Sequence, residues 1–200
     1  LDRAEGHGST GIHDHPWDYY FKLLLHTHRD AGPHWTEAPV LVLALIGILA
    51  ALFGKVGTQA SRPFLRFLAI YAAALVTVFC IIPYKTPWNL LEFHDALILL
   101  AGVGAAALIR TGRFLPVRVV LALVIAASAV HMGRQTHLGI TRYPADLRNP
   151  YVYAHTSTNL LRLVERVHDI AAIHPQGKNM HINIIREGAD YWPLPWYLRE

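Results

Sequence analysis

Four long apolar runs are the feature of this sequence that most constrains its fold. They cover Ala38 to Gly54, Pro63 to Pro83, Leu90 to Ile109 and Pro116 to Met132. A helix needs about 20 residues to cross about 30 Å of hydrocarbon. Runs that are apolar on every side and joined by short polar connectors are typical of membrane spans rather than of a soluble helical core. The sequence therefore predicts a mainly α fold, a polytopic α-helical membrane bundle with four transmembrane helices.

The distribution of charge agrees with this prediction. Only 16% of the residues are charged, 53% are hydrophobic and the mean hydropathy is +0.27, which is unusual for a water-soluble domain. Between Ala38 and Met132 the only acidic residues are Glu92 and Asp95. The net charge of +4 comes from basic residues dispersed between the apolar runs, so nucleic acid is not a predicted partner. Cys80 is the only cysteine, which excludes an internal disulfide or a cysteine-based zinc site.

Positive charge in the connectors predicts the orientation, because cytoplasmic loops carry an excess of Lys and Arg. Two connectors are basic and contain no acid; one holds Lys55, Arg62 and Arg66, and the other holds Arg110, Arg113 and Arg118. With both connectors cytoplasmic, both ends of the chain are extracytoplasmic in a multi-pass protein of the plasma (cell inner) membrane. The predicted parts are an extracytoplasmic loop with an interfacial helix (1–37), a transmembrane region (38–133) and a small α/β segment (134–200).

The predicted extracytoplasmic tail contains one helix and one strand. Thr156, Ser157 and Thr158 are candidate N-caps for an amphipathic helix from Asn159 to Ile173. Alternation of apolar and polar side chains predicts a strand from Met180 to Arg186. Because one helix and one strand cannot bury a core, we interpret this α/β segment as incomplete and the chain as a piece of a longer protein.

Candidate site residues lie in the segments predicted to face outward. Lys85 is the only cation between the second and third runs, and a compact ammonium group there suits a lipid phosphate, although membrane anchoring is the simpler alternative. Glu92 and Asp95 are three residues apart at the start of the third run and share a helix face. They either face a polar cavity or are stabilised by the positive end of the helix dipole.

The segment before the first run places His15, Trp17, Tyr19 and Tyr20 around Pro16. Trp and Tyr favour the headgroup region, so an interfacial helix anchored by aromatic side chains is the alternative to a binding corner. His13 and His15 are the nearest candidates for holding a metal, but no carboxylate spacing supports them, so a divalent metal is left open as a cofactor and no metal ligand is assigned.

Two motifs resemble a known class of membrane enzymes. HDHPWDYYFKLLL (13–25), an apolar span, and a second span ending in IIPYKTPWN (81–89) resemble part of the membrane core of GT-C glycosyltransferases of the protein O-mannosyltransferase and aminoarabinose-transferase type. The tail sequences NPYVYAHTSTNLLRLVERV and DYWPLPWYLR are most similar to the membrane proteins described as flippase-activity-associated in archaeal N-glycosylation. The resemblance covers most of the chain.

The resemblance implies a hexosyltransferase that takes a sugar from a polyprenyl-phosphate carrier in the membrane lipid and delivers it to an acceptor protein, glycan or lipid outside the cell. It carries over His15, Trp17, Tyr19 and Tyr20 from the first motif, and Lys85, Pro87 and Trp88 from the second. Tyr84, next to Lys85, is a further candidate for substrate binding. The acidic residue that acts as base or metal partner in the first outer loop of such families has no match here. A lipid-carrier flippase or transport partner, and a membrane anchor for an extracytoplasmic binding domain, are the alternatives.

Overall fold

The computed structural model describes residues 13–54, 62–153, 155–185 and 192–199, and these residues form two compact units. The first unit ends at Tyr153 and the second begins at Ala154. The predicted boundary at 133/134 lies 20 residues earlier. The difference arises because residues 134–153 complete the last long helix and then pack on the first unit.

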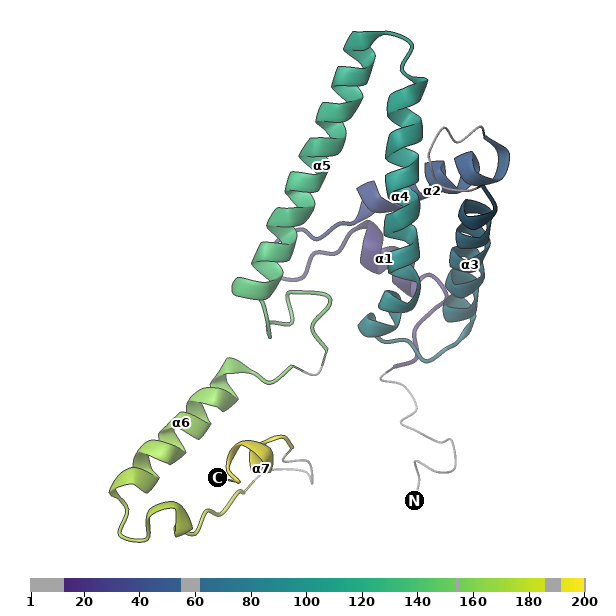
Figure 1. The fold of residues 1–200 in the computed structure, drawn as a ribbon. Helices are drawn as coiled ribbons and strands as arrows, with labels where there is room; N and C mark the ends of the chain where they lie inside the picture. The colour runs from purple at the N-terminus through teal and green to yellow at the C-terminus, as the bar shows by residue number, and fades with distance from the viewer. Residues whose placement is uncertain (1–12, 55–61, 154, 186–191, 200) are drawn as a thin grey trace. The chain divides into compact units, whose positions relative to one another are not determined.

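The regular elements in the described part of the first unit are all helices (Figure 1). Its elements in chain order are α1 (Tyr19–Leu25), α2 (Ala38–Phe53), α3 (Arg62–Ile81), the 3-10 helix η1 (Pro87–Leu90), α4 (Leu91–Thr111) and α5 (Leu115–Thr141). Their buried side chains form one apolar cluster drawn from α1, α2, α3 and α4. The prediction of a mainly α fold is confirmed.

Among the described residues, three helices are long and apolar enough to cross a membrane: Arg62–Ile81, Pro87–Thr111 and Leu115–Thr141. The remaining predicted span, the first run from Ala38 to Gly54, corresponds to α2, whose 16 residues reach only about 24 Å. Helix α5 is almost entirely exposed, with Gln135 as its one buried residue, and its exposed surface is largely apolar. An apolar helix of this kind needs a lipid or protein neighbour, which supports a membrane-embedded protein.

Helices α2 and α4 cross so closely that their backbones are in contact. A Cβ atom added to Gly47 would lie 1.9 Å from the Leu100 carbonyl oxygen, and one added to Gly104 would lie 1.9 Å from the Leu43 carbonyl oxygen. These positions accept only glycine, because the two backbones are in contact there. This crossing holds the start of α4 beside the segment that precedes α2.

Residues 142–153 fold back against the segment before α2. The buried Trp35 indole donates from Nε1 to the Arg148 carbonyl oxygen at 2.9 Å. The Gln135 side chain exchanges two hydrogen bonds with the Thr36 backbone, accepting from its N–H and donating to its carbonyl, each at 2.7 Å. These bonds fix the end of α5 to the beginning of α2.

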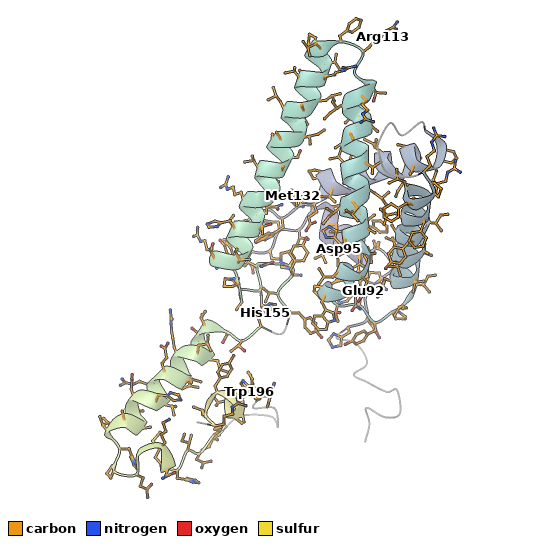
Figure 2. All side chains as sticks on the ribbon, viewed as in Figure 1. Glu92, Asp95, Arg113, Met132, His155 and Trp196 are labelled. Carbon is orange, nitrogen blue, oxygen red and sulfur yellow. The ribbon has the colours of Figure 1, made fainter. Side chains whose placement is uncertain are left out.

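The two ends of the first unit carry different residues. The α4–α5 connector with Arg113 lies at one end of α4, and Glu92 lies at the other (Figure 2). Helix α3 runs antiparallel to α4, so Arg62 at its start lies toward the Arg113 end (Figure 1). Lys55 of the predicted basic connector lies outside the described residues.

The second unit contains α6 (Thr158–Ile173), the 3-10 helix η2 (Gly177–Asn179) and the single-turn α7 (Leu194–Tyr197). The predicted cap is confirmed: Ser157 Oγ accepts from the Leu160 N–H at 3.2 Å. The structure differs from the predicted strand, because residues 180–185 belong to no strand. A strand requires a hydrogen-bonding partner, and the described part of this unit offers no second one.

Candidate functional site

The two motifs come together although they are about 70 residues apart in sequence. Segments 13–20 and 82–90, which we call the junction, meet in an antiparallel bridge centred on Asp14 and Tyr84. The two backbone hydrogen bonds of the bridge measure 3.1 and 2.9 Å. The junction precedes α4 and lies at the end of α4 that carries Glu92 (Figure 2).

Lys85 is the most buried charged residue of the junction. Its side chain is 1% exposed, and its ammonium group donates to the backbone carbonyl oxygens of His15, at 3.2 Å, and of Ile82. The sequence placed this lysine on an open rim, whereas the structure places it beneath the loop that carries His15. Its charge is therefore held in a fixed position by two carbonyl dipoles.

An aromatic layer extends from the first motif to the start of α4. The His15 ring stacks on Tyr19 with centroids 4.2 Å apart. Tyr20 is buried, donates from its hydroxyl to the Thr86 carbonyl oxygen at 3.4 Å, and meets Phe93 edge to face. Tyr20 therefore packs in the core of the first unit, while His15 and Tyr19 are only partly covered.

The exposed aromatic residues of the junction are Trp17, Tyr84 and Trp88, with 68%, 48% and 49% of their surfaces accessible. His13 meets Tyr84 edge to face, and the Tyr153 hydroxyl lies 2.7 Å from a ring nitrogen of His13. Trp88 and Tyr153 also meet edge to face, with centroids 4.5 Å apart. Sequence reasoning did not assign Tyr153, although it belongs to the NPYVYAH segment.

The environment lowers the pKa of the His15 imidazole below 6.5. Burial contributes most, the positive charges of Lys85 and His13 add to it, and Asp14 opposes it. His15 is therefore neutral near pH 7, with one ring nitrogen able to donate and the other able to accept a hydrogen bond.

The predicted carboxylates of Glu92 and Asp95 are both exposed, and neither forms a hydrogen bond or ion pair with the residues that the structure describes. The side chain between them, His94, points inward instead. Its Nε2 lies 2.7 Å from the Glu37 carboxylate, whose other oxygen accepts from the Tyr151 hydroxyl at 2.6 Å. This Glu37–His94–Tyr151 network joins three segments, and sequence reasoning missed it.

The network shifts the pKa values of two of its members. Burial alone would raise the pKa of Glu37, but the hydrogen bonds from His94 and Tyr151, together with the charge of His94, lower the pKa below its usual 4.5. Burial and the neighbouring carboxylate raise the pKa of the Tyr151 hydroxyl. Glu37 is therefore ionised and Tyr151 is a hydrogen-bond donor over the physiological range.

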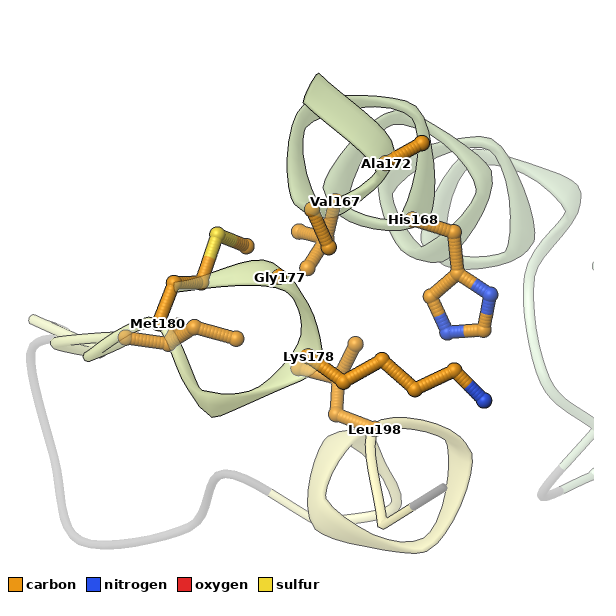
Figure 3. A pocket seen from close by; sticks show the side chains of 9 residues that line it. Val167, His168, Ala172, Gly177, Lys178, Met180 and Leu198 are labelled. Atoms are coloured by element: carbon orange, nitrogen blue, oxygen red, sulfur yellow. The ribbon is translucent and has the colours of Figure 1, made fainter. Parts of the chain in front are cut away.

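A cavity of about 350 Å³ lies within the second unit (Figure 3). His168 and Lys178 lie side by side at one edge of it, and most of the remaining lining is apolar. Its volume lies in the range of small-molecule sites. The lining residues are Val167, His168, Ala171, Ala172, Gly177, Lys178, Met180, Ile182 and Leu198.

No group of three or more His, Cys, Asp or Glu side chains is arranged to hold a metal in the part of the chain that the structure describes. His13 and His15, the candidates from the sequence, turn their rings toward Tyr84 and Tyr19. We therefore derive no chemical step through a metal at the junction.

Comparison with protein-family models, with curated proteins and with solved structures finds no significant match to this chain.

Proposed function

We propose that this chain is part of an integral membrane glycosyltransferase of the GT-C type. It transfers a sugar, in this proposal, from a polyprenyl-phosphate donor to an acceptor at the extracytoplasmic face of the plasma membrane. The observation that supports the proposal most is the junction: the two motifs that carry the resemblance, far apart in sequence, are paired backbone to backbone.

The proposed role of Lys85 is electrostatic. When the glycosidic bond to the carrier breaks, the departing phosphate gains negative charge, and a cation already fixed nearby stabilises it without reorganising. The ammonium group donates to two carbonyl oxygens and is 1% exposed, so in this proposal its positive charge acts on the phosphate through the covering loop and not by direct contact. Burial strengthens the attraction, because the effective dielectric constant is lower there than in water.

The exposed aromatic side chains have a proposed binding role. Trp17, Tyr84 and Trp88 present flat apolar faces with a polar atom at one edge, which suits a site between hydrocarbon and water. Neutral His15 and the adjoining Tyr19 would contact the sugar or phosphate by hydrogen bonds. Glu92 and Asp95 have no assigned role in the reaction, and a catalytic base remains unassigned among the described residues.

Donor binding tests this proposal. We expect Lys85→Met to weaken binding of a photoactivatable polyprenyl-phosphate sugar to the full-length protein in native membranes by at least tenfold, or about 1.4 kcal/mol. Lys85→Arg should retain most of the binding, and Trp17→Ala should reduce it less than Lys85→Met does. Lys22→Met is the matched control, because Lys22 is an exposed cation paired with Asp18 at 2.7 Å.

Two further variants test the donor site even if the substitution of the buried Lys85 prevents the protein from folding. Tyr84→Ala and Trp88→Ala remove exposed side chains, and each should weaken donor binding about threefold or more without lowering the melting temperature. Undiminished binding in both of these variants and in a folded Lys85→Met protein would refute the donor site.

The orientation of the proposed membrane part is tested by labelling single cysteines with a membrane-impermeant reagent in a Cys80→Ala background. Tyr84→Cys should react in intact cells, because this exposed residue belongs to the predicted outer face. Arg113→Cys, at the opposite end of α4, should react only after permeabilisation (Figure 2). The reverse pattern would show that the ends of the bundle are assigned the wrong way round.

The cavity of the second unit favours one alternative, a membrane anchor that carries a ligand-binding domain. A carrier flippase is the other alternative, since it would bind the same lipid headgroup without breaking a bond. Release of free polyprenyl phosphate from labelled donor supports the transferase, whereas donor binding without release supports the flippase.

A further inference from the structure

Three histidines lie on one face of a short two-stranded ribbon between α1 and α2. The ribbon is held by an antiparallel pair, Thr27 and Trp35, which exchange both backbone hydrogen bonds at 2.8 Å. Side chains alternate between faces along a strand. His26 and His28, on either side of Thr27, therefore share a face with His34, while Thr27 and Trp35 point to the other.

The opposite face of this ribbon is firmly anchored. Trp35 is 3% exposed, and its indole Nε1 donates to the Arg148 carbonyl oxygen at 2.9 Å. Because Trp35 cannot rotate without breaking these contacts, the backbone that carries His34 is fixed in position. The three histidine rings, by contrast, are exposed to solvent.

Two of these rings already meet through their nitrogens. His26 Nε2 and His34 Nδ1 are 3.0 Å apart in a hydrogen bond, and the His28 ring stacks on His34 with centroids 4.2 Å apart. Two imidazole nitrogens bound to one tetrahedral Zn²⁺ at 2.0–2.1 Å would be about 3.3 Å apart. A small rotation of exposed rings therefore converts the hydrogen-bonded pair into a chelating pair.

We propose that His26 Nε2 and His34 Nδ1 form a binding site for a divalent cation of the zinc class, in which the metal replaces the proton shared by the two rings. Imidazole is a preferred ligand of Zn²⁺, Cu²⁺ and Ni²⁺, whereas Mg²⁺ and Ca²⁺ require oxygen ligands. Water occupies the remaining coordination positions. His28 is a positioning residue that holds the plane of the His34 ring by stacking.

Zinc titration of the full-length protein, purified without a histidine tag in lipid nanodiscs, tests this site by competition with a fluorescent chelator. We expect His26→Ala and His34→Ala each to weaken Zn²⁺ affinity at least tenfold, since loss of groups that merely orient ligands costs 10–100-fold. His28→Phe keeps the stacked ring without its nitrogens and should stay within threefold of the wild type. His137→Ala, an exposed histidine on α5, is the control and should have no effect.

Two results would overturn the assignment. Unchanged Zn²⁺ affinity in both His26→Ala and His34→Ala would remove the site, and a loss in His28→Phe as large as in His26→Ala would refute the two-nitrogen arrangement. All these side chains are exposed, so the variants should keep the wild-type melting temperature in the absence of metal. The site is independent of the proposed transferase activity, and Lys85→Met should leave Zn²⁺ affinity unchanged.

Discussion

Gly104→Ala should destabilise the first unit by about 3 kcal/mol or more, although it adds a single methyl group. The new Cβ would lie 1.9 Å from the Leu43 carbonyl oxygen and 2.9 Å from the Gly47 nitrogen, and both neighbours are backbone atoms that cannot rotate away. Helices α2 and α4 would have to separate, and the apolar contacts between them would be lost. A fall of roughly 10 °C in melting temperature, measured on the full chain in detergent, is the expected size of the effect.

Gly102→Ala supplies a matched control two residues away in the same helix. A Cβ atom at Gly102 meets no heavy atom within 4 Å, so the substitution introduces no clash. Alanine favours a helix over glycine by about 1 kcal/mol, and this variant should therefore be slightly more stable than the wild type. Equal melting temperatures for the two alanine variants would contradict the close crossing of α2 and α4.

Apolar composition predicted the positions of the long helices well, because the apolarity of a segment can be read from that segment alone. The first run, Ala38 to Gly54, matches α2 (Ala38–Phe53) to within one residue. The last run was predicted to end at Met132, whereas α5 continues to Thr141. Apolarity marks the part of a helix suited to hydrocarbon, and it does not report where a helix continues into a polar segment such as 133–141.

The surroundings of Lys85 were beyond sequence reasoning for a physical reason. Residue type and position indicated a cation between two spans, and that much is seen in the structure. Its burial depends on a backbone pairing with residues 13–15, about 70 positions away, which no local pattern encodes. The same holds for Glu37, which directly precedes an apolar run and gives no sign in the sequence of its partners, His94 on α4 and Tyr151 after α5.

His94→Ala should lower the free energy of unfolding by about 3 kcal/mol, because it leaves the largely buried, ionised Glu37 carboxylate without the His94 ring nitrogen that faces it at 2.7 Å. The side chains of His94 and Glu37 are only 12% and 15% exposed, so water cannot readily replace the lost contact. Chemical denaturation of the full chain in detergent measures the loss. Glu92→Gln, an exposed carboxylate two residues earlier on α4, is the control and should change stability by less than about 0.5 kcal/mol.

The pH dependence of stability distinguishes the contribution of the Glu37 charge from that of its packing. The folded-state pKa of Glu37 lies below its ordinary 4.5, so ionised Glu37 contributes stability that is fully present above pH 4.5 and lost as the pH falls through the folded-state pKa. Glu37→Gln cannot titrate, and its stability deficit against the wild type should shrink below pH 4.5. A deficit that stays constant down to the acid unfolding transition would mean that packing, rather than charge, is what Glu37 contributes. Because this carboxylate binds the first turn of α4 and the segment after α5 together, its protonation would loosen both attachments at once.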